Sequence, residues 1–143
     1  MEKKGIFRPQ TSYSDKVFLL KLYPGINPSI LEYLQEQGYR GVYLEGFGLG
    51  GMPFLKNDFI GAAGKAIDNG MVILAGSQCR YEGSNLSVYE TGRKALKSGV
   101  LQAYDMTAEA AVTKLMWVLG QTEDIREIRE YFSVDIAGEV SIN

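Results

Sequence analysis

Short apolar runs alternate with helix-like segments along most of this chain, and this alternation limits the possible folds more than any other feature. The runs are nearly continuous in apolar residues, which is typical of strands covered on both faces of a parallel sheet. They are Val17–Leu22, Gly41–Leu44, Met71–Ala75 and Val100–Ala103. A strand–helix alternation of this kind predicts an α/β fold with three layers, α/β/α, around a small open parallel sheet of about four strands.

Helix start and stop signals separate these runs. Asn27-Pro28, Thr107 and Thr122 are expected to begin helices, because Asn and Thr cap helix N-termini and Pro is tolerated in the first turn. Glycines placed after apolar stripes predict where helices stop. The expected helices cover about 28–37, 58–69, 86–98 and 107–119, the last ended by Gly120, with a fifth after Thr122. Residues 1–15 are polar and are predicted to be an arm or linker, with 16–143 forming one domain.

The residue types exclude several kinds of chemistry. The chain has no His, so it can hold neither a Ser-His-Asp or Cys-His catalytic group nor a His metal site. Its one Cys excludes an internal disulfide and a thiolate metal cluster, and no metal or cofactor is expected. With 17 acidic and 15 basic residues, the net charge is −2, which predicts no binding to nucleic acid or to an acidic membrane. No apolar stretch approaches the ~20 residues of a spanning helix, and a cytoplasmic location is expected.

A glycine-rich loop follows the second apolar run. Residues 46–51 read G-F-G-L-G-G and contain the G-x-G-x-x-G pattern of dinucleotide-binding loops. That function needs a helix to open directly after the glycines, whereas Met52-Pro53 intervenes here. The loop is therefore expected to let the backbone approach a ligand or another subunit closely.

Two further groups lie near expected strand ends. Cys79 follows the third run, and without a His base it is expected to be a small buried residue rather than a nucleophile. Tyr89-Glu90 falls in the first turn of the third expected helix. The Glu90 carboxylate could bind an ammonium group, or it could be a solvated side chain at a favourable helix terminus; the sequence leaves both possibilities open.

Several segments of the sequence occur together, in the same order, in one enzyme family. They are Leu22-Tyr23-Pro24-Gly25, Leu44–Gly50, Ser77-Gln78-Cys79, Val88–Arg93, Asp105–Ala111, Lys114-Leu115-Met116-Trp117 and Ala137-Gly138-Glu139-Val140. On these segments, the stretch from about Lys16 to Val140 resembles the C-terminal domain of cytoplasmic-type (type I) L-asparaginases. The family's T-G-G-T and H-G-T-D-T motifs, which carry its catalytic threonines, do not occur in this chain.

The resemblance implies a function and a set of partners. The parent enzyme would convert L-asparagine and water to L-aspartate and ammonia, with no catalytic residue in this chain. The chain would pack on its own N-terminal catalytic domain within a homo-oligomer, a dimer or a tetramer, and would be inactive alone. It would also contribute to the edge of the substrate site.

The resemblance also assigns residues. A carboxylate that contacts the substrate's α-amino group in a neighbouring subunit would be Glu90, or Tyr89 if the alignment slips by one. Gly51 stands where the family often has an Asn that contacts the substrate. Some bacterial members hold a regulatory asparagine with a Cys that matches Cys79 and an Arg that would fall at Glu45, so Glu45 departs from that pattern.

Two other functions remain open. One is the asparaginase-like part of the archaeal amidotransferase subunit that makes Gln-tRNA, which shares the Ser-Gln-Cys and Lys-Leu-Met-Trp segments. The glycine loop of this chain, residues 46–51, resembles that of the hydrolase more than that of the amidotransferase. The other is a non-catalytic ligand-binding or dimerisation module.

Overall fold

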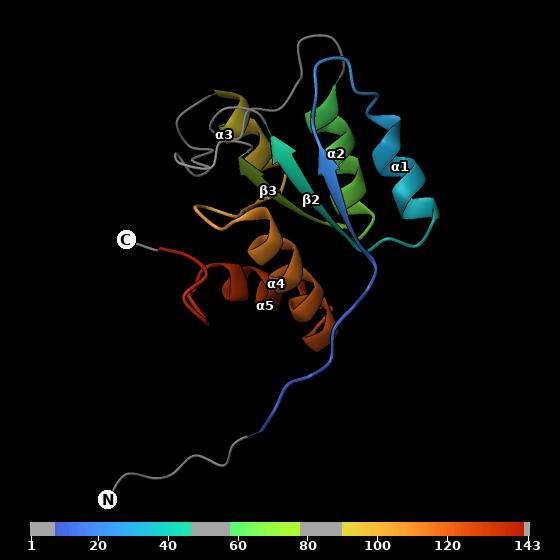
Figure 1. The fold of residues 1–143 in the computed structure, drawn as a ribbon. Coiled ribbons are helices and arrows are strands. Elements are labelled where there is room, and N and C mark those ends of the chain that lie inside the picture. The colour runs from blue at the N-terminus through green and yellow to red at the C-terminus, as the bar shows by residue number, and fades with distance from the viewer. Residues whose placement is uncertain (1–7, 47–57, 78–89, 142–143) are drawn as a thin grey trace, which may run out of the picture.

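Four parallel strands form the centre of the molecule. The computed structural model describes residues 8–46, 58–77 and 90–141. Within them, the strands are β1 (Val17–Lys21), β2 (Gly41–Gly46), β3 (Val72–Ser77) and β4 (Leu101–Gln102), and they lie side by side in the order β1-β2-β3-β4 (Figure 1). The helices are α1 (Ser29–Glu36), α2 (Phe59–Asp68), α3 (Glu90–Lys97), α4 (Ala108–Gln121) and α5 (Ile125–Phe132). The predicted parallel sheet of about four strands is confirmed.

The helices cover both faces of this sheet. Because each of α1, α2 and α3 connects one strand to the next in a parallel sheet, right-handed crossovers place all three on one face. There, Leu31, Ala63 and Ala95 form one core with alternate strand residues such as Val42 and Ile73. On the opposite face, a second core joins α4 and α5 to the sheet. Its members include Tyr43, Leu74, Leu115 and Ile128. The three-layer α/β/α architecture is therefore confirmed.

Local side-chain caps explain where several helices begin. The Asp58 carboxylate accepts a hydrogen bond from the Gly61 N–H at 2.8 Å, at the start of α2. The Thr107 hydroxyl accepts one from the Ala110 N–H at 3.1 Å, at the start of α4. Both residues satisfy N–H groups that have no partner inside their helix. The sequence predicted the cap at Thr107, and it predicted a helix start near residue 58 without assigning a cap there.

Two predicted boundaries at the C-terminal end are wrong. Helix α4 does not end at Gly120 but continues through it to Gln121. Helix α5 is capped by Asp124, which accepts from the Arg126 N–H at 2.8 Å, while the Thr122 hydroxyl accepts from the Asp124 N–H at 3.0 Å. Thr122 thus shapes the turn between the helices, and the nearer carboxylate takes the capping position.

Other boundaries move by a few residues. Strand β3 extends through Gly76 and Ser77, beyond the apolar run that predicted it. Helix α3 is described from Glu90 onward, and the expected start near Leu86 lies outside the described residues. No helix in the described part of the chain is long and apolar enough to cross a membrane.

The glycine at position 120 is explained by the N-terminal arm. Residues 8–15 form neither helix nor strand, but they lie against α4. The Ser14 N–H donates to the Met116 carbonyl at 2.8 Å, and Trp117 Nε1 donates to the Gln10 carbonyl at 2.9 Å. A Cβ atom added to Gly120 would lie 2.4 Å from Tyr13 Cα. Gly120 is therefore the position where the arm comes closest to the helix.

Candidate functional site

The carboxyl ends of the strands meet at one edge of the sheet. The strand register places Lys21 opposite Glu45, Glu45 opposite Gly76, and Ala75 opposite Gln102. The Leu22 N–H extends this pairing by donating to the Glu45 carbonyl at 2.9 Å. In open parallel sheets, ligands bind at this edge. The geometry brings together the starts of the loops after β1, β2, β3 and β4.

Tyr43 is the largest buried side chain near this edge. Its side chain passes directly over Gly76, since a Cβ atom added to Gly76 would lie 2.0 Å from the Tyr43 hydroxyl oxygen. Burial raises the pKa of Tyr43 to about 12, with further contributions from the negative charges of Glu45 and Glu109. The buried Tyr43 phenol therefore stays protonated at physiological pH.

Sequence reasoning overlooked Tyr43 and Gly76. The signal was present: Tyr43 and Glu45 lie two residues apart on one strand, so their side chains share one face of the sheet. Gly76 stands diagonally across from Tyr43 on β3. The absence of a side chain at Gly76 leaves the space that the Tyr43 ring occupies.

The loop after β4 has an unusual backbone. Tyr104 has a φ of +50°, a left-handed conformation that residues other than glycine rarely adopt. The next residue, Asp105, accepts a hydrogen bond from the Ser141 N–H at 2.8 Å. This hydrogen bond lowers the pKa of Asp105 and ties the loop to the C-terminal segment.

Glu90 lies at the first described residue of α3. Its side chain is 73% exposed and forms an ion pair with Lys94, one helical turn later, at 3.0 Å. The hydrogen bond and charge of Lys94 hold the pKa of the Glu90 carboxyl below its usual value. The carboxylate is therefore ionised and accessible at neutral pH.

The structure places two of the predicted site residues. Glu45 lies on β2, half-buried at the carboxyl edge, and Glu90 lies exposed on α3. Gly51, Cys79 and Tyr89 lie outside the described residues. Among the residues that the structure describes, no group of three or more Cys, Asp or Glu side chains is arranged to hold a metal ion.

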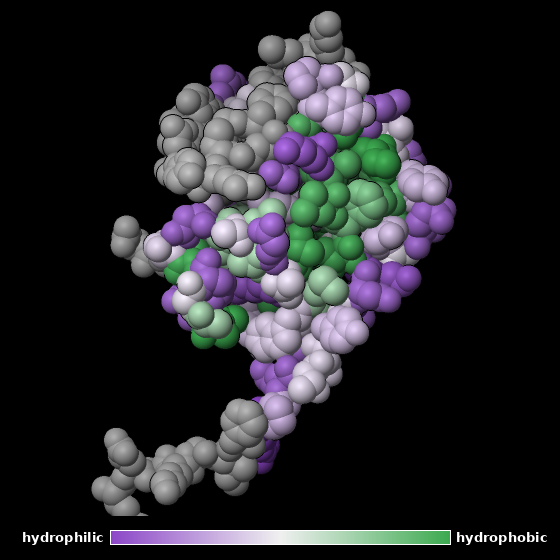
Figure 2. Space-filling model, viewed as in Figure 1, coloured by the Kyte–Doolittle hydropathy of each residue, from purple (hydrophilic) through white to green (hydrophobic). Residues whose placement is uncertain are grey.

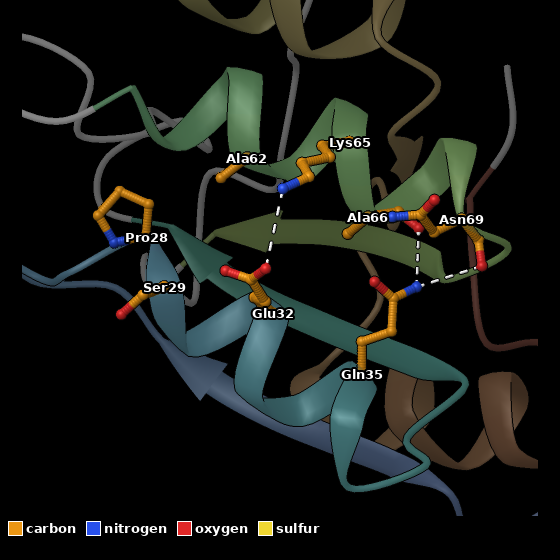
Figure 3. A pocket seen from close by; sticks show the side chains of 8 residues that line it. All are labelled: Pro28, Ser29, Glu32, Gln35, Ala62, Lys65, Ala66 and Asn69. Carbon is orange, nitrogen blue, oxygen red and sulfur yellow. Dashed lines mark hydrogen bonds and ion pairs between the residues drawn. The ribbon is translucent and has the colours of Figure 1, made fainter.

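A groove elsewhere on the surface separates α1 and α2 (Figure 3). Glu32 and Lys65 face each other across it at 3.8 Å, and Gln35 Nε2 donates to the carbonyls of Ala66 and Asn69 at 3.2 Å each. The Gln35 amide thus satisfies carbonyls at the C-terminal end of α2. These contacts join the two helices, so we assign the groove to helix packing.

A buried ion pair closes the C-terminal end of the domain. Lys114 on α4 contacts Glu139, and the two side chains are 5% and 13% exposed. The Lys114 ammonium also donates to the Val134 carbonyl at 2.8 Å and lies 5.5 Å from the centre of the Phe132 ring. Glu139 in turn accepts from the Ala137 N–H at 2.7 Å. The Lys-Leu-Met-Trp and Ala-Gly-Glu-Val segments of the sequence are therefore joined in space.

A family model supports the interpretation of these segments. Residues 16–132 match the family described as "Glutaminase/Asparaginase C-terminal domain". The match covers all the described helices and strands.

Curated relatives and solved structures fall into two groups. The chain is 45% identical over 138 residues to a glutamyl-tRNA(Gln) amidotransferase subunit of Thermococcus kodakarensis, covering 96% of this chain and 31% of the relative. It is 46% identical over 127 residues to the corresponding amidotransferase subunit of Pyrococcus horikoshii, covering 89% and 28%. The second group consists of solved asparaginases.

The thermostable L-asparaginase from Thermococcus kodakarensis is similar to this chain with a TM-score of 0.86 and 36% identity, covering 92% of this chain and 40% of that one. L-asparaginase I from Vibrio cholerae gives a TM-score of 0.86 with 26% identity, covering 97% and 42%. The chain spans about three tenths of the amidotransferase subunits and about two fifths of the asparaginases. The chain belongs to the glutaminase/asparaginase C-terminal domain family.

Proposed function

We propose that this chain is the C-terminal domain of the amide-hydrolysing subunit of a glutamyl-tRNA(Gln) amidotransferase. One observation carries this choice. Two proteins of the same organism, Thermococcus kodakarensis, can be compared: the chain is 45% identical to the amidotransferase subunit and 36% identical to the L-asparaginase. The amidotransferase, which was the alternative in the sequence analysis, therefore becomes the first choice.

The role of the domain in that subunit is to form one wall of the amide site. The chain carries neither catalytic threonine motif of the family, so the amide bond would be broken by residues outside it. The exposed, ionised Glu90 carboxylate suits the α-amino group of an amide-bearing amino acid, because a charge-assisted hydrogen bond is stronger than a neutral one. Tyr89 and Gly51, which lie outside the described residues, would contribute to the same substrate site.

Glu45, which the family resemblance places with Cys79 in a regulatory asparagine site, is assigned a structural role instead. In a regulatory asparagine site, a cation would meet the ligand's carboxylate, and Glu45 supplies the opposite charge. Glu45 instead adds to the negative field around Tyr43. We propose that this position supports the folded carboxyl edge and binds no regulatory asparagine.

A free-standing L-asparaginase is the second candidate. The TM-score of 0.86 to two L-asparaginases supports it, as does the glycine loop at residues 46–51. In that case the same domain would line an asparagine site within a homo-oligomer, with no RNA involved.

Ammonia release by the complete polypeptide that contains this chain, together with any partner subunit, separates the two functions. Asparagine or glutamine is supplied with and without glutamyl-tRNA(Gln). If the protein is the amidotransferase, ammonia release should be about tenfold faster or more with glutamyl-tRNA(Gln) than without it. Equal rates with and without tRNA would contradict the proposal and favour the asparaginase. The chain alone is expected to release none.

A further inference from the structure

Two side chains of α4 hold the main chain of the N-terminal arm. The Trp117 indole N–H donates to the Gln10 carbonyl at 2.9 Å, and the Gln121 side-chain amide donates to the Ser12 carbonyl at 2.6 Å. Trp117 and Gln121 lie one helical turn apart, about 6 Å, which is close to the roughly 6.6 Å between alternate residues of an extended chain. The helix therefore offers two donors at the spacing of the arm's carbonyl groups.

The main chain of the arm adds a third hydrogen bond. The Ser14 N–H donates to the Met116 carbonyl at 2.8 Å, so the contacts fall on residues 10, 12 and 14. Alternate residues of an extended chain face the same side. Tyr13, which lies between two of them, has a side chain that is 68% exposed, and its main chain comes so close to Gly120 that an added Cβ atom would collide with it. The arm thus meets the helix with its main chain.

Both donors on α4 are oriented by contacts of their own. The Trp117 ring packs edge-to-face against Tyr131 of α5, with 5.3 Å between ring centres and an angle of 84°. The Gln121 amide also donates to the Trp117 carbonyl at 3.1 Å. Because these two side chains are already ordered, holding the arm costs little further side-chain entropy.

Hydrogen bonds, rather than apolar burial, hold the described part of the arm. Residues 8–15 read R-P-Q-T-S-Y-S-D and include no aliphatic side chain. Figure 2 shows this segment in purple and white, with no green surface along it. A segment that served to cover the core would carry apolar side chains. The contacts therefore fix the direction of the arm and add little to the core.

The arm continues directly into the sheet. The Lys16 carbonyl accepts from the N–H groups of Arg40 and Gly41 at 2.8 and 3.1 Å, and β1 begins at the next residue. From Gln10 to the end of β1, the main chain is therefore held at least at every second residue. Figure 1 shows the arm leaving the sheet at the end opposite to the carboxyl edge.

We propose that the arm is a strut that joins this domain in a fixed direction to the polypeptide preceding it, and that Trp117 and Gln121 are positioning residues for the amide site. The inference rests on the proposed function, in which the chain is the C-terminal domain of a longer subunit and forms one wall of that site. The carboxyl edge lies one strand length, about 17 Å, from the arm, so a rotation of a few degrees at the arm moves the edge by about 1 Å. A misplacement of about 1 Å can slow an enzyme about a hundredfold.

Amide exchange in the complete polypeptide that contains this chain tests whether the arm is held. The Ser14 N–H, which donates to α4, should exchange slowly in the wild type. The double variant Trp117→Phe, Gln121→Glu removes both side-chain donors, and Ser14 should then exchange about tenfold faster or more, while Leu115 inside α4 stays protected. A Ser14 amide that exchanges freely in the wild type, or that stays protected both in the double variant and in Gly120→Ala, would overturn the proposal.

Small-angle scattering and steady-state kinetics of the same polypeptide test whether the held arm positions the domain. The double variant should show a larger maximum dimension, and its kcat/KM for ammonia release from asparagine or glutamine should fall about tenfold or more. Tyr131→Phe, which removes one polar group from the same aromatic pair, should match the wild type in both measurements. Wild-type scattering or wild-type kinetics in a double variant with a released Ser14 amide would overturn the proposal. Exchange and scattering do not depend on the reaction catalysed, so the strut can fail while the proposed function stands, and the reverse.

Discussion

Lys114 and Glu139 form a buried ion pair between helix α4 and the C-terminal segment, 25 residues apart in sequence. Glu139 also accepts hydrogen bonds from two main-chain N–H groups, and Lys114 donates to the Val134 carbonyl. Both charges are therefore paired and hydrogen-bonded, which is the condition under which buried charges are tolerated. The pair fastens residues 134–139 to the second core.

Removing one partner of this pair is expected to destabilise the domain strongly. Lys114→Met should lower the free energy of unfolding by about 3–5 kcal/mol, because Glu139 is left as a buried, unpaired charge. The double variant Lys114→Met, Glu139→Gln should recover part of this loss. Urea unfolding measures both, with Lys94→Met at the exposed pair as the matched control, where little change is expected. A Lys114→Met variant as stable as the wild type would contradict this account.

The same pair predicts a loss of stability in acid. Burial alone would raise the pKa of Glu139, but hydrogen bonds from Lys114 and from main-chain N–H groups lower it from 4.5 to about 2. A carboxyl whose pKa is lower in the folded state stabilises the fold above its unfolded value. This contribution should be complete above about pH 4.5 and should decline as the pH falls toward 2.

Thermal unfolding between pH 2 and pH 7 measures this decline. The melting temperature of the wild type should fall more steeply below pH 4.5 than that of Glu139→Gln, which lacks the titrating group. Parallel pH profiles for the two proteins would show that Glu139 does not contribute.

Gly76→Ala is expected to disturb the carboxyl edge. The added Cβ atom would lie 2.0 Å from the Tyr43 hydroxyl oxygen and 2.7 Å from Cζ of the same ring, so the ring must move. Overpacking of this kind costs about 1–3 kcal/mol. The matched control is Gly64→Ala on α2, where the nearest atom is 3.5 Å away and the substitution should be neutral or stabilising. Equal stabilities by urea unfolding would contradict the close packing of Tyr43 on Gly76.

Gly120→Ala is expected to release the N-terminal arm without unfolding the domain. Its Cβ atom would collide with main-chain atoms of Ser12 and Tyr13 at 2.4–2.5 Å. The hydrogen bond from Trp117 to the Gln10 carbonyl should then break, which changes the tryptophan fluorescence. Trypsin should cleave after Lys16, at the end of the arm, faster than in the wild type. Unchanged cleavage would show that the arm adjusts without leaving α4.

The sequence predicted the order of strands and helices because local signals determine it. Asp58 and Thr107 cap helices through residues three positions later, and the apolar runs fix the strands. The helix stop predicted at Gly120 is wrong. A glycine is needed at this position because the arm at Tyr13 approaches α4 closely there, and Tyr13 lies more than 100 residues away in the sequence. The Lys114–Glu139 pair was not predicted for the same reason: neither segment reveals its partner locally. For the candidate site, the strand–helix order predicted that the carboxyl ends of the strands would form one edge. The Tyr43–Gly76 contact was not predicted, because it depends on the register between β2 and β3.

Glu90→Gln in the complete enzyme tests the proposed substrate contact. If the carboxylate binds the α-amino group of the amide donor, kcat/KM should fall about ten- to a hundredfold, since ~1.4 kcal/mol corresponds to a factor of ten. The control is Lys94→Met, which breaks the pair with Glu90 but keeps the carboxylate. Steady-state kinetics should show a much smaller effect for Lys94→Met. Wild-type kinetics for Glu90→Gln would remove Glu90 from the site, and Tyr89→Phe would be tested next.

Formation of glutaminyl-tRNA tests the proposed function most directly. The complete polypeptide that contains this chain, with its partner subunit, is incubated with glutamyl-tRNA(Gln) and an amide donor, and the amino acid on the tRNA is then identified. The account predicts that glutamate on the tRNA is converted to glutamine, and that the conversion stops when the amide donor is omitted. Glutamate that remains unchanged on the tRNA, while asparagine is hydrolysed at full rate, would contradict it.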